Sequence, residues 1–223
     1  MARHDAARPR RANYTNHLVI MAKSPVAGHV KRRLGREIGD VAATRFYRNC
    51  LSHTALRLAQ DRRWHTLLAI DPDSDVAAPF APWRATLARA PQGEGDLGQR
   101  MLRLFSLLPP GPAIIVGSDV PAIEAGHVAQ AFNLLGRSDA VFGPAADGGY
   151  WLIGLKRTPK MLAPFAGVRW SSPHALTDTL ANLKGRRVAF AVTLSDVDGK
   201  HDYDAMRGFA ERLVFNSTLR RFL

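Results

Sequence analysis

The residues best suited to chemistry form an acidic cluster late in the chain. Asp196, Asp198, Asp202 and Asp204 place four of the 19 acidic residues within nine positions. In an extended segment, residues two apart point to the same side, so Asp196 and Asp198 converge while Val197 turns away. Two like charges brought together are unfavourable unless a cation bridges them. The spacing therefore favours a site for Mg²⁺ or Mn²⁺ over an exposed acidic turn.

A further carboxylate, Asp119, comes three positions after the apolar run 113–116, in the sequence GSDVP. In open α/β sheets, ligands bind beyond the carboxyl ends of the strands, so an acid at this position lies at the mouth of the sheet. Its oxygens can hold a hard cation. An aspartate that begins a turn beside Pro121 is an equally common arrangement, and this stretch alone does not separate the two.

A basic loop follows the first apolar run. Residues 23–34 read KSPVAGHVKRRL, with Lys23, Lys31 and Arg33 around a turn that contains Gly28. Backbone amides in such a loop, together with flanking cations, suit a polyphosphate. The loop is not a Walker A motif, because GxxxxGK[ST] is absent. The alternative is a solvated basic turn.

Two further stretches are rich in glycine. Residues 143–150 carry Asp147 before Gly148 and Gly149. Residues 93–98, which contain Gly95, Asp96 and Gly98, match GxGxxG. A dinucleotide fingerprint opens the first βαβ unit, whereas this one follows the third expected strand, and a lone GxGxxG is weak support for a dehydrogenase. We therefore do not expect a nicotinamide cofactor.

Composition limits the classes of protein that fit. The 223 residues are 46% hydrophobic and 22% charged, which is typical of one globular domain and excludes a disordered chain. No apolar run approaches the roughly 20 residues of a membrane span. A single cysteine, Cys50, excludes an internal disulfide framework, and with no signal peptide we expect a cytoplasmic protein. The net charge of +12 suits a phosphate-bearing ligand, but no dedicated nucleic-acid-binding motif is present.

Short apolar runs alternate with longer amphipathic stretches, which predicts an α/β protein. Near-continuous apolar strands indicate a mostly parallel central sheet that is covered by helices on both faces. We therefore expect a single three-layer domain over 17–223. A disordered basic tail is expected over 1–16. Strands are expected at 18–22, 66–70, 85–88, 113–116, 140–142, 150–155 and 188–192. Helices are expected at 40–60, 97–107, 124–135, 173–183 and 204–215. In the fourth of these, Pro173 would be the first helical residue and Ser172 would cap the helix.

These segments, in this order, resemble the bacterial GT-A-type glycosyltransferases of the nucleotide-diphospho-sugar transferase superfamily, which include members linked to arsenosugar biosynthesis. The family is in turn similar to the phospholactate and phosphoenolpyruvate guanylyltransferases. The matching motifs are AKSP (22–25), KRRL (31–34), GDLGQRM (95–101), GSDVP (117–121), GPAADGGY (143–150), WSS (170–172) and DVD (196–198). The chain departs from the pattern at three positions, where Arg32 replaces Thr, Ala27 replaces Pro, and Ala122 replaces a second acid.

The resemblance implies a GT-A-like fold and a metal-dependent transferase that acts on a nucleotide-sugar and a small acceptor. Asp119, Asp196 and Asp198 would hold Mg²⁺ or Mn²⁺, and the basic loop would clamp the phosphates. The loop over 93–98 would close over the base or ribose. Asp147 would lie where the acceptor or the sugar approaches.

Two other functions share these residues. A nucleotidyltransferase would couple a nucleoside triphosphate to a phosphorylated small molecule and release pyrophosphate, and the basic loop suits a triphosphate. A nucleotide-binding module without turnover is the third hypothesis. The sequence names neither the base, nor the sugar, nor the acceptor.

Overall fold

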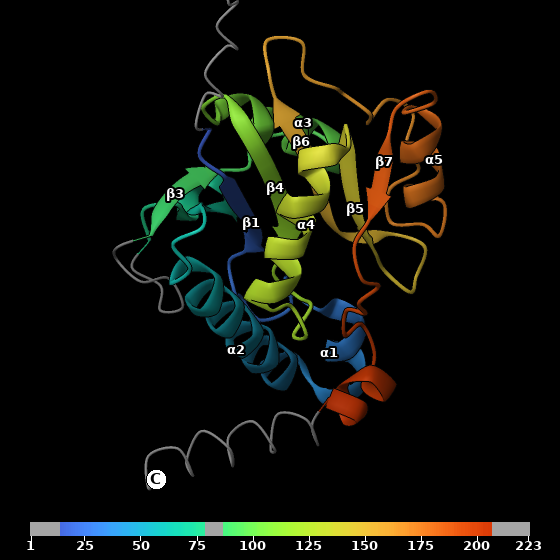
Figure 1. Cartoon of the computed structure of the whole chain (residues 1–223). Helices are drawn as coiled ribbons and strands as arrows, with labels where there is room; N and C mark the ends of the chain where they lie inside the picture. The colour runs from blue at the N-terminus through green and yellow to red at the C-terminus, as the bar shows by residue number, and fades with distance from the viewer. Residues whose placement is uncertain (1–13, 79–86, 207–223) are drawn as a thin grey trace, which may run out of the picture.

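A seven-stranded sheet forms the centre of the molecule, in the order β3-β2-β1-β4-β6-β5-β7 (Figure 1). The computed structural model describes residues 14–78 and 87–206. The strands are β1 (His17–Lys23), β2 (His65–Asp71), β3 (Ala88–Pro91), β4 (Gly111–Gly117), β5 (Ala140–Pro144), β6 (Tyr150–Arg157) and β7 (Val188–Phe190). Only β6 runs antiparallel to its neighbours, β4 and β5. The predicted α/β fold with a mostly parallel central sheet is confirmed.

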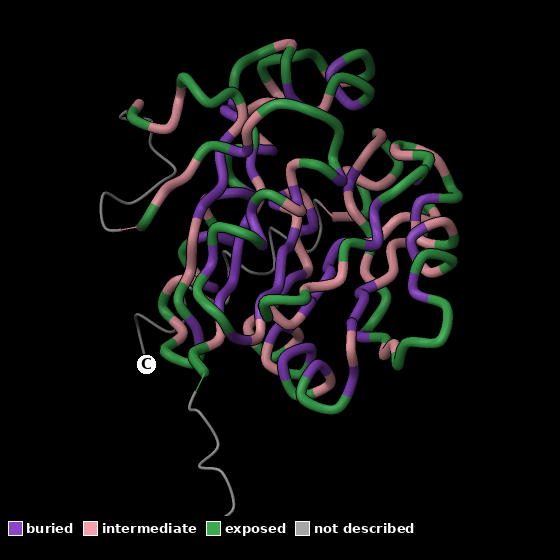
Figure 2. Tube along the Cα trace, turned by 90° about the horizontal axis from the view of Figure 1, so that it is seen from above, coloured by how far each residue is buried: buried purple, intermediate pink, exposed green. Residues whose placement is uncertain are grey.

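Helices cover both faces of this sheet, because the strand residues alternate between two cores. Leu18 and Ile20 pack with α2 (Asp40–Ala59) and α4 (Ala125–Arg137). Val19, between them, packs with α3 (Leu97–Leu107) and with residues of the segment that contains α5 (Ala175–Ala181). Figure 1 shows α4 in front of the sheet and α3 behind it, and the central strands are the most buried part of the chain (Figure 2).

The element boundaries agree with expectation except at a few places. Helix α1 (Arg32–Ile38) and a short 3₁₀ turn at Asp73–Asp75 were not predicted. The third strand, expected over 85–88, pairs with β2 over Ala88–Pro91, and 79–86 lie outside the described residues.

The fifth helix and the final helix also begin at other positions than expected. Helix α5 begins two residues after Pro173, because the Ser172 hydroxyl accepts from the backbone N–H of His174 and donates to the carbonyl of Arg169. The final helix begins at Lys200 rather than Asp204, and its continuation to 215 falls mostly outside the described residues.

Asn16, the last residue of the expected tail, contacts the sheet. Its carbonyl accepts from the backbone N–H of His65 at 2.9 Å, and its side chain donates to the carbonyl of Arg63. Residues 1–13 lie outside the described part of the chain. Within the described residues, none of the helices combines the length and the apolar character needed to cross a membrane.

Two histidines stack at the amino ends of β1 and β2, at the end of the sheet opposite the loops that follow β1 and β4. His17 is buried, and its ring centroid lies 6.0 Å from that of His65. Burial, and then the charge of His65, lower the pKa of His17 below its usual 6.5. The unfolded chain therefore binds a proton there more readily than the folded protein does.

We expect the stability of the folded protein to fall as the pH drops from about 6.5 towards the lower pKa of folded His17, because the proton favours the unfolded chain over that window. A His17→Gln protein should lose part of this pH dependence. Urea unfolding at a series of pH values between 5 and 8 measures it. An unchanged pH profile in the variant would contradict the assignment to His17.

Candidate active site

A cavity of about 670 Å³ opens at the carboxyl ends of β1, β4 and the end of β3, where the fold class places ligands. This volume is in the range of small-molecule sites. Four cationic side chains and two aspartates contribute to its lining: Lys23, Lys31, Arg32, Arg33, Asp119 and Asp198. Apolar residues, including Met21, Met101 and Ile153, line the part of the cavity nearer α3. The cavity therefore combines a charged half with an apolar half.

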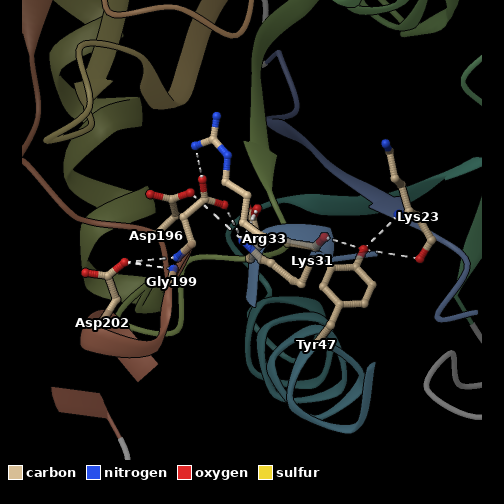
Figure 3. A network of polar contacts seen from close by, with 10 residues as sticks. Lys23, Lys31, Arg33, Tyr47, Asp196, Gly199 and Asp202 are labelled. Atoms are coloured by element: carbon tan, nitrogen blue, oxygen red, sulfur yellow. Dashed lines mark hydrogen bonds and ion pairs between the residues drawn. The ribbon is translucent and has the colours of Figure 1, made fainter. Parts of the chain in front are cut away.

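Lys31 lies among three carboxylates. Its Nζ is 2.9 Å from Asp119 Oδ2, 3.9 Å from Asp196 Oδ2 and 3.7 Å from Asp198 Oδ1, and its side chain is only 6% exposed (Figure 3). Burial alone would lower the pKa of Lys31, but the ion pair and hydrogen bond with Asp119, reinforced by the other two charges, raise it. The ammonium therefore stays charged and offsets part of the carboxylate repulsion.

Asp196 and Asp198 lie on the same side of their segment, as the i, i+2 spacing predicted. Val197, between them, is 1% exposed and packs against Leu34 and Ala43. Asp198 also pairs with Arg33 at 2.9 Å. Burial raises the pKa of Asp196; Lys31 opposes that shift, and the neighbouring aspartates add to it. The segment thus presents two carboxylates to Lys31, one of which, that of Asp198, lines the cavity, because one apolar side chain anchors it.

Tyr47, on α2, connects the loops that follow β1 and β4. Its hydroxyl accepts from the backbone N–H of Lys23 at 2.8 Å and lies 3.0 Å from the Ser118 hydroxyl, next to Asp119 (Figure 3). Burial raises the pKa of Tyr47 to about 12, so the hydroxyl keeps its proton at neutral pH. The buried Cys50 thiol lies on the same helix, and burial raises its pKa to about 12. As predicted, Cys50 is a core residue.

Replacing Tyr47 with Phe should loosen both loops without unfolding the protein. We expect the free energy of unfolding to fall by about 1–2 kcal/mol, because the three neutral hydrogen bonds of the Tyr47 hydroxyl, two with the Lys23 backbone and one with Ser118, are lost. The affinity for a phosphate-bearing ligand should fall roughly tenfold, since loop geometry becomes less fixed. Urea unfolding and calorimetry measure the two effects. Tyr14→Phe, at a tyrosine that is 61% exposed, is the matched control, and wild-type affinity in Tyr47→Phe would contradict the bridging role.

The loop over 92–96, between β3 and α3, is braced along its backbone. Arg103 donates to the carbonyls of Gln92 and Glu94, and Arg100 donates to the carbonyl of Gly95. Asp73 accepts from the backbone N–H of Gly93. Gly93 and Gly95, the first two glycines of the GxGxxG match, therefore belong to a fixed turn after the third strand rather than the first.

Asp96, predicted to bind nucleotide, caps helix α3. Its Oδ1 accepts from the backbone N–H of Gln99 at 2.8 Å, and the Gln99 side chain accepts from the backbone N–H of Asp96 at 2.9 Å. This reciprocal pair satisfies two donors at the start of the helix. Gly98 in the first turn packs closely on Phe165 and Trp170, where a Cβ would have no room. The structure therefore gives Asp96 and Gly98 structural contacts, and Gly95 a left-handed turn (φ 101°).

Asp147, Gly148 and Gly149 form the turn between β5 and β6, outside the cavity lining. Asp147 Oδ1 accepts from the backbone N–H of Gly149 at 2.9 Å. Its charge is among those that raise the pKa of Asp196, so it lies within electrostatic range of the cluster. Gly148 adopts φ +86°, and a Cβ there would meet the backbone of Pro173. The turn is therefore held against the segment that precedes α5.

Gly148→Ala should destabilise the protein by at least about 2 kcal/mol, because a left-handed residue with a Cβ is strained and the Pro173 backbone cannot move aside easily. Gly149→Ala is the matched control, since that glycine has no left-handed φ and its added Cβ would meet only the Asp147 side chain, with Oδ1 at 3.1 Å. Urea unfolding of both variants measures the difference. Equal destabilisation would show that the left-handed turn is not the cause.

The structure brings together Lys23, Lys31, Arg33, Asp119 and Asp198 on one cavity, with Asp196 next to Lys31. Gly28, Gly95, Asp96, Gly98 and the 147–149 turn lie outside its lining. Sequence reasoning missed Tyr47 and Gln92, which do line it, and gave no site role to Ser171 of the WSS motif, which lines it too. Gln92 follows β3 directly and could have been found by the strand-end rule, had β3 been placed correctly. The contact of Tyr47 with Ser118, 71 residues away, had no local signal.

Gln92 is fixed by the strands beside it. It is 5% exposed, and its Nε2 donates to the carbonyls of Ala22 and Ala69, each at 3.0 Å. Ser171 and Lys31 are the two non-glycine residues with positive φ in the described part of the chain, and both line the cavity. Strained backbone of this kind concentrates at functional sites, which supports the assignment of this cavity as the site.

The sheet order and the cavity define an α/β protein of the nucleotide-diphospho-sugar transferase-like class, and solved structures agree. A candidate nucleotide-diphospho-sugar transferase from Desulfovibrio desulfuricans G20 matches with a TM-score of 0.75 and 29% identity over 82% of each chain. A nucleotidyl transferase from Methanothermobacter thermautotrophicus matches with a TM-score of 0.61 and 13% identity, over 91% of this chain and all of the other.

A third solved structure, the 4-diphosphocytidyl-2C-methyl-D-erythritol synthase from Anaerococcus prevotii DSM 20548, has a TM-score of 0.59 at 10% identity. The match covers 89% of this chain and 99% of that one. At such identities, the second and third similarities show the fold alone. No curated protein sequence matches this chain.

The sequence profile described as "Uncharacterized protein conserved in bacteria (DUF2064)" matches residues 54–172, more than half of the chain. The protein therefore belongs to the DUF2064 family. The predicted superfamily resemblance is supported by the structural neighbours; the finer resemblance, to glycosyltransferases linked to arsenosugar biosynthesis, stays a prediction.

Proposed function

We propose that the protein is a metal-dependent transferase that transfers a glycosyl group from a nucleotide-sugar to a small acceptor. The observation that carries this proposal is the juxtaposition, in one cavity at the carboxyl ends of the strands, of cationic side chains with converging aspartates. The similarity to a candidate nucleotide-diphospho-sugar transferase at 29% identity supports an enzyme of this kind.

The cations at the mouth of the cavity would bind the diphosphate. Lys23, Arg32 and Arg33 are exposed there, although Arg33 also pairs with Asp198, and each would donate the short, charge-assisted hydrogen bonds that phosphate oxygens accept. Their positive charge would stabilise the leaving nucleotide, while Gln92 of the braced loop and the apolar wall near α3 would hold the base and ribose. Catalysis then consists mainly of positioning and electrostatic stabilisation.

Asp119, Asp196 and Asp198 would hold Mg²⁺ or Mn²⁺. The donor set fits a hard cation, since one oxygen of each of the three carboxylates lies within 3.9 Å of Lys31 Nζ. Within 14–78 and 87–206, no group of three acidic, histidine or cysteine side chains already has the spacing of metal ligands. In the aspartate cluster, the Lys31 ammonium lies between the three carboxylates. A bound divalent ion would offset the charge of the diphosphate as it leaves.

Asp147 would position the acceptor. Its turn lies within electrostatic range of the carboxylate cluster but outside the cavity lining, so an acceptor approaching the diphosphate from β5 and β6 would meet it. We place it there as a positioning carboxylate.

Nucleotidyl transfer is the second candidate. The four cations of the cavity suit a triphosphate, and one of the similar structures is a nucleotidyl transferase by name. Such an enzyme would couple a nucleoside triphosphate to a phosphorylated small molecule and release pyrophosphate. The same positioning cations would serve both reactions.

A screen of nucleoside triphosphates and nucleotide-sugars with Mn²⁺, followed by product analysis, tests the proposal. Thermal protection by a nucleotide-sugar and release of a nucleoside diphosphate support glycosyl transfer, whereas release of pyrophosphate supports nucleotidyl transfer. Binding without turnover across a broad acceptor panel would leave only a nucleotide-binding module. Asp178→Asn, which breaks an ion pair with Arg169 outside the cavity lining, is the matched control for Asp119→Asn.

A further inference from the structure

The buried position of Lys31 is unusual for a residue at the mouth of a phosphate-binding cavity. Its neighbours Arg32 and Arg33 are exposed, whereas its own side chain is 6% exposed and directed at Asp119, Asp196 and Asp198. Its backbone adopts φ 47° and ψ 46°, a left-handed conformation that a residue with a Cβ rarely takes. The chain thus turns unfavourably at this residue and places an ammonium among the three carboxylates.

A divalent ion and this ammonium cannot share the cluster. Three carboxylates carry more negative charge than Lys31 and Arg33 together offset, so the remaining negative charge favours a further cation there. However, the ammonium lies at the point that such an ion would occupy, and two cations about 4 Å apart repel each other strongly where water is partly excluded. Metal binding therefore requires Lys31 to leave.

We propose that Lys31 is an internal counter-ion that holds the aspartate cluster together until a divalent metal and a diphosphate enter, and that its ammonium then moves to the phosphates. A lysine suits this exchange, because its charge is compact and its four-carbon stem is flexible. The exposed cations on either side mark where the phosphates would lie. This inference rests on the proposed function for the identity of the incoming ligand.

The exchange makes the metal and the diphosphate bind cooperatively. Metal alone must displace Lys31 into solvent, whereas metal with a diphosphate gives the ammonium a new partner. By linkage, each ligand raises the affinity of the other by the same factor, which for coupled sites is about 5–150-fold. Metal alone should therefore bind wild-type protein weakly.

Calorimetry with Mn²⁺ alone tests the competition. Lys31→Gln should bind Mn²⁺ at least about tenfold more tightly than wild type, because nothing has to be displaced. Its melting temperature without metal should fall, and Mn²⁺ should restore it. Lys23→Gln is the matched control, since it also removes a cation from the cavity, and Lys23 forms no ion pair with a carboxylate of the described residues. This control should bind Mn²⁺ like wild type. Equal or weaker binding in Lys31→Gln overturns the proposal.

A second measurement needs only the wild-type protein, in case Lys31→Gln does not fold. Saturating inorganic pyrophosphate should raise the affinity for Mn²⁺ at least about tenfold, after correction for the complex that the two form in solution. Unchanged affinity overturns the proposal. Neither measurement uses a nucleotide or turnover. Competition between Lys31 and Mn²⁺ can therefore be detected even if the proposed transferase activity is not. Conversely, if the wild-type protein turns over but Lys31→Gln binds Mn²⁺ with unaltered affinity, the proposed function stands and only the inference about Lys31 is overturned.

Discussion

An Asp198→Asn protein should bind a nucleotide in the presence of Mn²⁺ at least about a hundredfold more weakly than wild type. Groups that merely support a metal ligand change metal affinity by about 10–100-fold, so the loss of a ligand should cost at least the upper end of that range. Asp198 is about half exposed, and its ion pair with Arg33 lies at the surface, where such pairs contribute little stability. The metal-free variant should therefore melt close to the wild-type temperature.

Calorimetry with Mn²⁺ and the best nucleotide of the screen, paired with melting curves, measures both effects. Asp204→Asn is a matched control in the same acidic stretch, since Asp204 pairs with Lys200 rather than with the cavity. Binding of the metal-nucleotide at wild-type affinity by Asp198→Asn would remove this residue from the metal site.

Val197→Asp should abolish the same binding without changing any group that contacts the ligand. Val197 is fully packed against Leu34 and Ala43, and a carboxylate there would be buried without a partner. We expect the segment around 197 to detach, taking Asp196 and Asp198 away from the cavity, and the free energy of unfolding to fall by about 3 kcal/mol.

Nucleotide titration and limited proteolysis of the 195–206 segment measure these two effects. Val192→Asp is the matched control, because Val192 is 41% exposed and five residues earlier in the same segment. A Val197→Asp protein that still binds the metal-nucleotide would show that other contacts hold the two aspartates in place.

Elements with strong local signals were predictable from the sequence. Helix α3 has the predicted bounds, 97–107, because the Asp96 and Gln99 cap and an apolar stripe define it locally. Helix α1 was missed, because it begins at a left-handed Lys31 without a side-chain cap and contains Gly35. Its buried face is completed by Val197, which is distant in the sequence, so local propensity carries almost no information about it.

The site was predictable in its residues but not in its contacts. The strand-end rule and the i, i+2 spacing indicated Asp119, Asp196 and Asp198, and these do come together around Lys31. That Lys31 lies among them could not be predicted, because the ion pair with Asp119 spans 88 residues and depends on the strand order. Likewise, the bracing of the 92–96 loop depends on Arg103, one turn further along α3 than the glycine motif reaches.

That braced loop has a kinetic consequence. Because Arg100, Arg103 and Asp73 already fix its backbone, an arriving ligand finds Gln92, the residue of this loop that lines the cavity, already in place, and little loop entropy is lost on binding. Association is then limited by encounter rather than by loop ordering. The cations at the entrance steer anionic ligands from a distance, so the association rate constant rises as the ionic strength falls.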